Sequence, residues 1–266
     1  MDYKKGDPHH FIPHTTYPKP HTPYPIPQTL NETMSTKLEK ILIDHIKQAN
    51  DQWNLFSKGE RLVIGISGGK DSLACLRLLS FFDLELTAVY VDFFGKHDEN
   101  LKAYCCNYTD YKHITSSFLE DKLDSKNICF NCSRQRRRLL LETAESINAT
   151  KVVLGHHKND VVETLLLNQI YSREISTMSP KQALFKGSYH IIRPMYLIPE
   201  PMLETYVKEQ NIPLFDLRCD FERDTKRKFV KDILKQIQDR SPGIDVVDNI
   251  FSSMDHIKPE FLPELP

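Results

Sequence analysis

The stretch Arg61-Leu-Val-Ile-Gly-Ile-Ser67-Gly68-Gly69-Lys70-Asp71-Ser72 decides the fold of this chain. Its first half is a short apolar run rich in β-branched residues, which predicts a buried strand. Two adjacent glycines then predict a turn whose backbone N–H groups face one point, because glycine carries no Cβ to block that approach. A helix from about Asp71 to Phe82 is expected next, and its N-terminus favours an anion at the turn.

The polar residues of this turn suit a pyrophosphate group. Lys70 supplies a mobile cation, Ser67 and Ser72 supply hydroxyl groups, and Asp71 is of the type that holds Mg²⁺ against phosphates. The spacing differs from the G-x-x-x-x-G-K-S/T of a P-loop and from the G-x-G-x-x-G of dinucleotide-binding folds. The sequence therefore predicts an anion-binding loop of a different type.

The chain on either side alternates helices with strands. Thr36 and Glu39 fit a capping box at the start of a helix. One face of that helix is apolar, with Leu38, Leu42, Ile46, Ala49 and Trp53. Further strands are expected at 86–92, 151–154 and 190–193 and one ending near Phe215, with a helix at 159–171. This order predicts an α/β fold, a doubly wound parallel sheet covered on both faces, with ligands at the carboxyl ends of the strands.

Composition limits the class of protein. The chain has 266 residues, of which 40% are hydrophobic and 27% charged, with a net charge of -1. No apolar run approaches the roughly 20 residues of a membrane span, and no secretory signal is visible. We therefore expect a cytoplasmic protein without a membrane partner, whose six cysteines are thiols, metal ligands or catalytic groups. Nucleic-acid binding would have to come from local basic patches.

Three segments are predicted. Residues 1–34 hold seven of the 16 prolines and are expected to be a disordered leader rich in proline and histidine. Residues 35–223 form the main domain. Residues 224–266 form a helical extension with helices at 225–239 and 246–257, separated by Pro242-Gly243. The first of these helices is basic, which predicts a solvated face, with nonspecific phosphate contacts as the alternative.

Three cysteines form a candidate metal site. Cys129-Phe-Asn-Cys132 is a C-x-x-C motif, and Cys219 follows about 90 residues later. Three thiolates suit a 4Fe-4S cluster with one open iron, whereas zinc would need a further ligand. On the residues alone, structural zinc, an iron–sulfur cluster and a redox pair all stay open. Cys75, Cys105 and Cys106 are expected to be structural.

Basic side chains follow the C-x-x-C motif directly. Arg134, Arg136, Arg137 and Arg138 lie near a predicted helix N-terminus, where the helix dipole disfavours positive charge, so we expect a role beyond local stability. Guanidinium groups bind phosphates bidentately and stack on unpaired bases. These arginines, with Arg193 at a strand end, are predicted to contact RNA or phosphate, and a solvated face is the alternative.

The motifs together resemble a known family. Ser67–Ser72, between a strand and a helix, resembles the PP-loop of the ATP pyrophosphatases. The pattern C-x-x-C-S-R-x-x-R-R from Cys129, then Gly155-His156-His157 with Asp160, is similar to the tRNA 2-thiocytidine synthetases, the TtcA-like family. The segments that extend this resemblance are Ile192–Pro194, Cys219–Asp232, Arg240–Gly243, Phe251–Met254 and Pro259. The resemblance covers residues 37 to 262.

The resemblance implies a reaction and its cofactors, which are ATP, Mg²⁺ and a 4Fe-4S cluster. ATP would activate C2 of an anticodon-loop cytidine at position 32 of tRNA as an adenylate, and sulfur held on the open iron would then displace AMP. The implied catalytic residues are Cys129, Cys132 and Cys219, which hold the cluster, and Asp71, which holds Mg²⁺. The implied ATP contacts are Ser67, Gly68, Gly69, Lys70, Asp71, Ser72, Gly155, His156 and Asp160. A cysteine desulfurase would supply the sulfur. The sequence allows a homodimer.

Two positions depart from the family pattern. Asp216 stands where the family often has the first cysteine of a second C-x-x-C, and Asn159 replaces an aspartate. The second change would weaken Mg²⁺ binding or alter a helix cap, and the stretch between Asp92 and Cys129 shows no clear match. The alternatives are another PP-loop tRNA-modifying enzyme, of the 2-thiouridine or lysidine type, and a nonenzymatic RNA-binding module stabilised by zinc.

Overall fold

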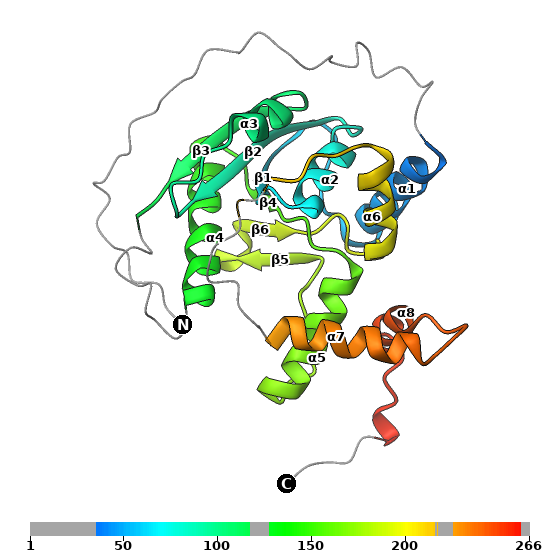
Figure 1. The fold of residues 1–266 in the computed structure, drawn as a ribbon. Coiled ribbons are helices and arrows are strands. Elements are labelled where there is room, and N and C mark those ends of the chain that lie inside the picture. The colour runs from blue at the N-terminus through cyan, green and yellow to red at the C-terminus, as the bar shows by residue number, and fades with distance from the viewer. Residues whose placement is uncertain (1–35, 118–127, 216, 218–225, 262–266) are drawn as a thin grey trace.

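The computed structural model describes residues 36–117, 128–215, 217 and 226–261, and Figure 1 shows their arrangement. The helices are α1 (Lys37–Trp53), α2 (Lys70–Leu79), α3 (Glu99–Cys106), α4 (Ile128–Ser146), α5 (Lys158–Ser172), α6 (Glu200–Glu209), α7 (Lys226–Asp239) and α8 (Val246–Ser253), with short 3₁₀ turns η2 (Phe185–Gly187) and η3 (Pro259–Phe261). The strands are β1 (Glu60–Ile66), β2 (Leu84–Asp92), β3 (Asp110–Thr115), β4 (Lys151–Val153), β5 (Lys181–Leu184) and β6 (Tyr189–Ile192).

The six strands form one sheet in the order β3-β2-β1-β4-β6-β5. Neighbouring strands are parallel except β5, which runs antiparallel to β6 at the edge. The chain moves outward from β1 to β3 on one side, and on the other side it passes from β4 to the edge strand β5 and returns to β6 between them. In open α/β sheets such a change of direction opens a crevice at the carboxyl ends of the strands, here those of β1 and β4. The predicted parallel sheet is confirmed.

Side chains of β1 alternate between the two faces of the sheet, as a strand covered on both faces requires. Leu62, Ile64 and Ile66 are buried in a core with α1, α2 and α6, whereas Val63 is buried in a second core with α4. Figure 1 shows these helices on opposite sides of the sheet. The predicted apolar face of α1 is confirmed, because its central residues are fully buried in the first core.

A buried polar network ties α1, α2 and α6 together. Arg77 of α2 donates to Glu39 of α1 (3.3 Å), to the hydroxyl of Tyr206 (2.9 Å) and to Gln210 (2.7 Å). The Tyr206 hydroxyl also donates to Glu39 (2.6 Å), and only 2% of Glu39 is exposed. Because α2 and α6 each begin at the carboxyl edge of the sheet, this network sets the relative position of their N-termini.

The C-terminal helices pack on α5 through a small core of their own. Val230 and Leu234 of α7 and Val246 of α8 are buried with Val162 of α5. These contacts orient α7. As a result Arg227 and Lys231, which lie one turn apart beside the buried face of this helix, contact the acidic groups described below. The predicted solvated basic face of α7 holds for Lys226, Lys228 and Lys235, which are exposed, whereas Arg227 and Lys231 also pair with acidic groups of the site.

Several sequence-based expectations differ from the structure. The strand expected near Phe215 was wrong: this segment is irregular, although Phe215 N–H donates to the Gly68 carbonyl (3.1 Å). The last helix ends at Ser253 and not at Ile257. The elements α3, β3, β5 and α6 were not predicted. The leader 1–34, Asp216 and Cys219 lie outside the described residues, and the division of the chain at 35 and 223 stays a prediction.

None of the helices in the described ranges could span a membrane, because each is too short or too polar to cross a bilayer.

We predict that Glu39→Ala lowers the free energy of unfolding by about 3 kcal/mol, because it leaves the Arg77 guanidinium and the Tyr206 hydroxyl without their buried acceptor. The matched control is Asp44→Ala on the same helix, which removes an exposed ion pair with Lys47 and is expected to cost no more than about 1 kcal/mol. Urea denaturation followed by circular dichroism measures both. Equal effects of the two substitutions would contradict the role of the network.

Candidate active site at the carboxyl edge of the sheet

The loop between β1 and α2 is braced by its own serines. Ser67 N–H donates to Ser72 Oγ (3.1 Å), which in turn donates to the Gly69 carbonyl (3.0 Å). Gly69 N–H donates to Ser67 Oγ (3.3 Å). Gly68 has a φ of +79°, a conformation that favours glycine. The hydroxyl groups predicted to contact phosphates therefore also fix the shape of the loop.

A second loop, between β4 and α5, packs directly on the first turn of α2. A Cβ added to Gly155 would lie 2.9 Å from the Asp71 carbonyl oxygen, so only glycine allows this approach. The contact brings His156, His157 and Asp160 beside the glycine loop, as the sequence predicted. The two loops follow adjacent parallel strands, which explains why they meet.

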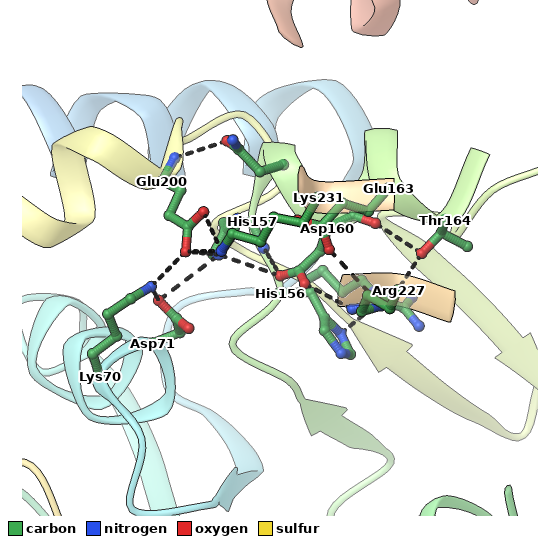
Figure 2. Close-up of polar contacts among 12 residues, drawn as sticks. Lys70, Asp71, His156, His157, Asp160, Glu163, Thr164, Glu200, Arg227 and Lys231 are labelled. Carbon is green, nitrogen blue, oxygen red and sulfur yellow. Dashed lines mark hydrogen bonds and ion pairs between the residues drawn. The ribbon is translucent and has the colours of Figure 1, made fainter. Parts of the chain in front are cut away.

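Lys70 lies at the centre of an ion-pair chain, shown in Figure 2. Its ammonium donates to Asp71 Oδ1 (2.8 Å) and to Glu200 Oε1 (2.9 Å). Glu200, at the start of α6, also accepts two hydrogen bonds of 2.8 Å from Lys231 of α7. Burial would raise the pKa of Glu200, but the hydrogen bonds from Lys231 and Lys70 lower it to about 2. The carboxylate is therefore ionised at physiological pH.

His157 sits among three carboxylates. Its Nε2 lies 3.5 Å from Asp160 Oδ2, 3.8 Å from Asp71 Oδ1 and 4.0 Å from Glu200 Oε1. The side chain is buried, and its Nδ1 has no hydrogen-bond partner within the described part of the chain. This imidazole joins the loop residues Asp71 and Asp160 to Glu200 of α6.

Asp160 is held from two sides at the start of α5. Its Oδ2 accepts from His157 N–H (3.1 Å) and its Oδ1 accepts from Arg227 of α7 (2.9 Å). Burial opposes ionisation, but the two histidines, this backbone bond and Arg227 keep the pKa of Asp160 below its usual value. Behind it, burial raises the pKa of Glu163 to about 7, although Arg227 lies 3.8 Å away. Arg227 thus bridges two acids of different strength.

His156, which is half-buried, and Arg193, which is buried, form a pair on the other side of Asp160. Arg193 donates to His156 Nδ1 (3.3 Å), to the Ser179 carbonyl and to Gln182 Oε1 (3.3 Å). Burial lowers the pKa of His156 to about 4, so the ring is neutral at physiological pH, and burial lowers the pKa of Arg193 to about 10. With only 3% of Arg193 exposed, these internal contacts place it inside the fold, and an RNA contact by this residue stays a prediction.

The C-x-x-C motif lies inside the first turns of α4, which begins at Ile128 and so earlier than the sequence suggested. Cys129 is exposed, Cys132 is partly buried, and neither forms a disulfide. Residues three apart are neighbours on a helix surface, so both thiols share one side of α4. One turn further, the Arg136 guanidinium lies 5.5 Å from the centre of the Phe93 ring, just beyond the carboxyl end of β2. The motif therefore lies near the edge that carries the glycine loop.

The third predicted ligand, Cys219, lies outside the described residues, but the chain leading to it is described. A Cβ added to Gly68 would lie 3.1 Å from Leu217 Cδ1, so Leu217 packs against the glycine loop. Within the described ranges, no group of three or more histidine, cysteine or acidic side chains is arranged to hold a metal ion. The cluster ligands thus stay a prediction.

The remaining arginines of α4 lie on its exposed side. Arg134, Arg137 and Arg138 are exposed, Arg137 donates to Ser133 Oγ (3.3 Å), and Arg138 pairs with Glu142 (2.7 Å). Arg137 also lowers the pKa of both His156 and Arg193, which indicates that it lies near the second loop. These side chains are accessible to a polyanion beside the site.

Sequence reasoning missed Glu200, and it did not assign Arg227 and Lys231 to the site. These two belong to the basic helix for which phosphate contacts were the alternative prediction, and their spacing puts both on one side of α7. Asn159, read as a departure from the family, accepts a hydrogen bond from Glu200 N–H (2.9 Å). It therefore caps the start of α6, which its sequence position alone does not reveal.

Comparison with known sequences identifies the family of this chain. The profile of the PP-loop domain family matches residues 30–237. The chain is 34% identical over 244 residues to the tRNA-cytidine(32) 2-sulfurtransferase of Polynucleobacter necessarius subsp. necessarius, covering 85% of this chain and 79% of that protein. It is 33% identical over 242 residues to the protein of the same name from Tolumonas auensis, covering 86% and 80% of the two chains.

Among solved structures, the U34-tRNA thiolase NcsA from Methanococcus maripaludis, described with its 4Fe-4S cluster, is similar with a TM-score of 0.68. The match covers 83% of this chain and 81% of that one at 19% identity, so it shows the fold alone. From the family profile and the sequence relatives together, this chain belongs to the PP-loop family and, within it, to the tRNA-cytidine(32) 2-sulfurtransferases.

Proposed function

We propose that this protein uses ATP to activate cytidine 32 of tRNA and then replaces the oxygen at C2 with sulfur, giving 2-thiocytidine. The observation that carries the proposal is the joining of three motifs at one sheet edge. The glycine loop packs on the Gly155 loop, and α4 brings the C-x-x-C motif to the same edge. The sequence relatives are named for this activity, and the match covers most of their length.

The geometry of the glycine loop suits a nucleoside triphosphate. Among the described residues, Ser67 Oγ is the one atom within 4 Å of a Cβ placed on Gly69, so the described part of the chain leaves room for a ligand to approach the backbone here. Burial would lower the pKa of Lys70, but hydrogen bonds with Asp71 and Glu200 raise it, so Lys70 stays cationic. The helix N-terminus of α2 adds a positive dipole end at the same point. Asp71 is the residue that would hold Mg²⁺, whose charge would offset that of the phosphates.

The first chemical step forms a bond between the cytidine C2 oxygen and the α-phosphorus of ATP, while the bond to the β-phosphate oxygen breaks and pyrophosphate leaves. Negative charge builds up on the leaving pyrophosphate, and Lys70 is placed to stabilise it. The oxygen at C2 is then a phosphate ester, so AMP can leave when sulfur attacks C2. The base has to be unstacked to reach the buried loop, which favours a substrate in a single-stranded loop.

Cys129 and Cys132 suit a cluster by their chemistry, because α4 presents both thiols from one side. Leu217, two residues before Cys219 in the sequence, packs on Gly68 of the glycine loop. The residues that would hold the cluster are Cys129, Cys132 and Cys219. A 4Fe-4S cluster on three thiolates supplies one iron with an open position for an exogenous sulfur ligand. A cysteine desulfurase would supply that sulfur as a persulfide, and an external thiol would supply the two electrons that bring it to the sulfide level before it attacks C2.

The test of the function is nucleoside mass spectrometry of tRNA from a strain that lacks the gene. We expect 2-thiocytidine to disappear and to return when the full chain is expressed. Unchanged 2-thiocytidine, or loss of lysidine or 2-thiouridine in its place, would redirect the proposal to another tRNA-modifying activity.

We predict that Lys70→Met lowers kcat/KM for AMP and pyrophosphate formation by about 100-fold or more, because the leaving pyrophosphate loses its placed cation. Lys47→Met, which removes a lysine from the exposed side of α1, is the control and is expected to keep the rate within about twofold. Steady-state assays with tRNA measure both. A wild-type rate for Lys70→Met would rule out the phosphate role of this loop.

For the cluster, we predict that Cys129→Ser, Cys132→Ser and Cys219→Ser each lose most of the iron and sulfide bound after anaerobic reconstitution, since a cluster needs all three thiolates. Cys106→Ser replaces an exposed thiol of α3 and is expected to keep about four irons per chain. Iron and sulfide analysis with absorption spectroscopy gives the measurement. Stoichiometric zinc in place of iron, or a full cluster in the Cys219 variant, contradicts the assignment.

A further inference from the structure

A basic residue that was not among the predicted site residues approaches the lysine of the glycine loop. Lys231 lies on α7, and its ammonium donates to both oxygens of Glu200 at 2.8 Å. Lys70 donates to the Oε1 atom of the same carboxylate at 2.9 Å. Because both bond one oxygen, the two ammonium nitrogens lie less than about 6 Å apart. Figure 2 shows the two lysines on either side of Glu200.

Both ammonium groups keep hydrogen-bonding capacity for a ligand. A lysine ammonium carries three N–H donors. In the described contacts Lys70 uses two of them, on Asp71 and Glu200, and Lys231 uses two on Glu200. One donor of each lysine is therefore available to an incoming acceptor without breaking the bridge through Glu200.

The two lysines differ in exposure in a way that suits a ligand from solution. The Lys231 side chain is 53% exposed and the Lys70 side chain 26%, whereas the Glu200 side chain between them is only 10% exposed. Arg227, one turn earlier, is bonded to Asp160 (2.9 Å), and Val230 is buried against α5, so the backbone of α7 is fixed on both sides of this turn. Lys231 is thus a cation on a fixed helix whose ammonium is held by a buried acid while about half of its side chain stays exposed.

Resting on the proposed function, we propose that Lys231 is a second polyphosphate-binding cation of this site and that Glu200 positions it beside Lys70. The ligand class is the pyrophosphate portion of ATP and the pyrophosphate that leaves. Burial would lower the pKa of Lys231, but the hydrogen bonds with Glu200 raise it, so the group stays charged. Two adjacent phosphate groups carry acceptor oxygens at the few-ångström spacing that the lysine pair requires.

The first experiment measures binding of inorganic pyrophosphate, α,β-methylene-ATP and AMP to the full chain by titration calorimetry. We expect Lys231→Met to weaken pyrophosphate and the ATP analogue by about 10- to 100-fold and AMP by no more than about twofold. A purely structural role would weaken all three ligands alike. Lys231→Arg keeps the charge and is expected to restore most of the affinity, and thermal unfolding shows whether each variant folds.

The matched control is Lys235→Met, which removes the same charge from an exposed position one turn further along α7 and is expected to leave all three affinities within about twofold. Wild-type pyrophosphate affinity in Lys231→Met, or an equal loss for AMP, would overturn the assignment of Lys231. Failure of the wild-type chain to bind the ATP analogue would instead overturn the proposed function, so the two failures are distinguishable.

The positioning role of Glu200 is tested by a double-mutant cycle with Glu200→Gln, which keeps the shape of the side chain and removes its charge. If Glu200 directs Lys231 toward the phosphates, Lys231→Met costs several-fold less affinity in the Glu200→Gln background than in the wild type. The same loss in both backgrounds would show that Lys231 acts without Glu200 and would overturn this part of the proposal.

Discussion

The buried carboxylate of Glu200 is the interaction on which the site depends. It accepts from Lys70 of α2 and Lys231 of α7 while its backbone N–H is held by Asn159 of α5, so four helices meet at one residue. A buried charge is stable only when it is paired and hydrogen-bonded, and this carboxylate has both kinds of partner. At the far ends of α2 and α6, the network around Arg77 fixes the same two helices a second time. The helices α2 and α6 are thus held near both of their ends.

This arrangement balances the charges of the site within the protein itself. Lys70, Lys231 and Arg227 are matched by the carboxylates of Asp71, Glu200 and Asp160, and the neutral ring of His156 adds no further positive charge. The cations are therefore ordered before the phosphates arrive, which reduces the reorganisation that binding requires.

The cysteine helix α4 belongs to the opposite face of the sheet but begins at the same edge. A strand switch between β1 and β4 lets elements from both faces meet there.

Much of this could be predicted from the sequence, for a physical reason. Strands such as β1 are buried on both faces, and the glycine loop joins a strand to a helix, so local pattern and fold agree at Ser67–Ser72. The edge strand β5 and the polar helix α3 carry weak patterns, and the Phe215 segment is apolar because it covers Gly68, not because it is a strand. Glu200 and Lys231 were missed because their meaning depends on contacts between helices far apart in the chain. Asn159 shows the same limit, since only the fold brings it to the start of α6.

The central claim is that ATP activation and sulfur insertion act on one nucleobase at this edge. The most direct test is anaerobic reconstitution of the full chain with tRNA, ATP and sulfide, counting AMP, pyrophosphate and 2-thiocytidine at position 32. The account predicts one AMP and one pyrophosphate for each 2-thiocytidine formed, and none of the three without tRNA. Thiolation that proceeds without ATP, or pyrophosphate release that leaves cytidine 32 unmodified while another base changes, would contradict it.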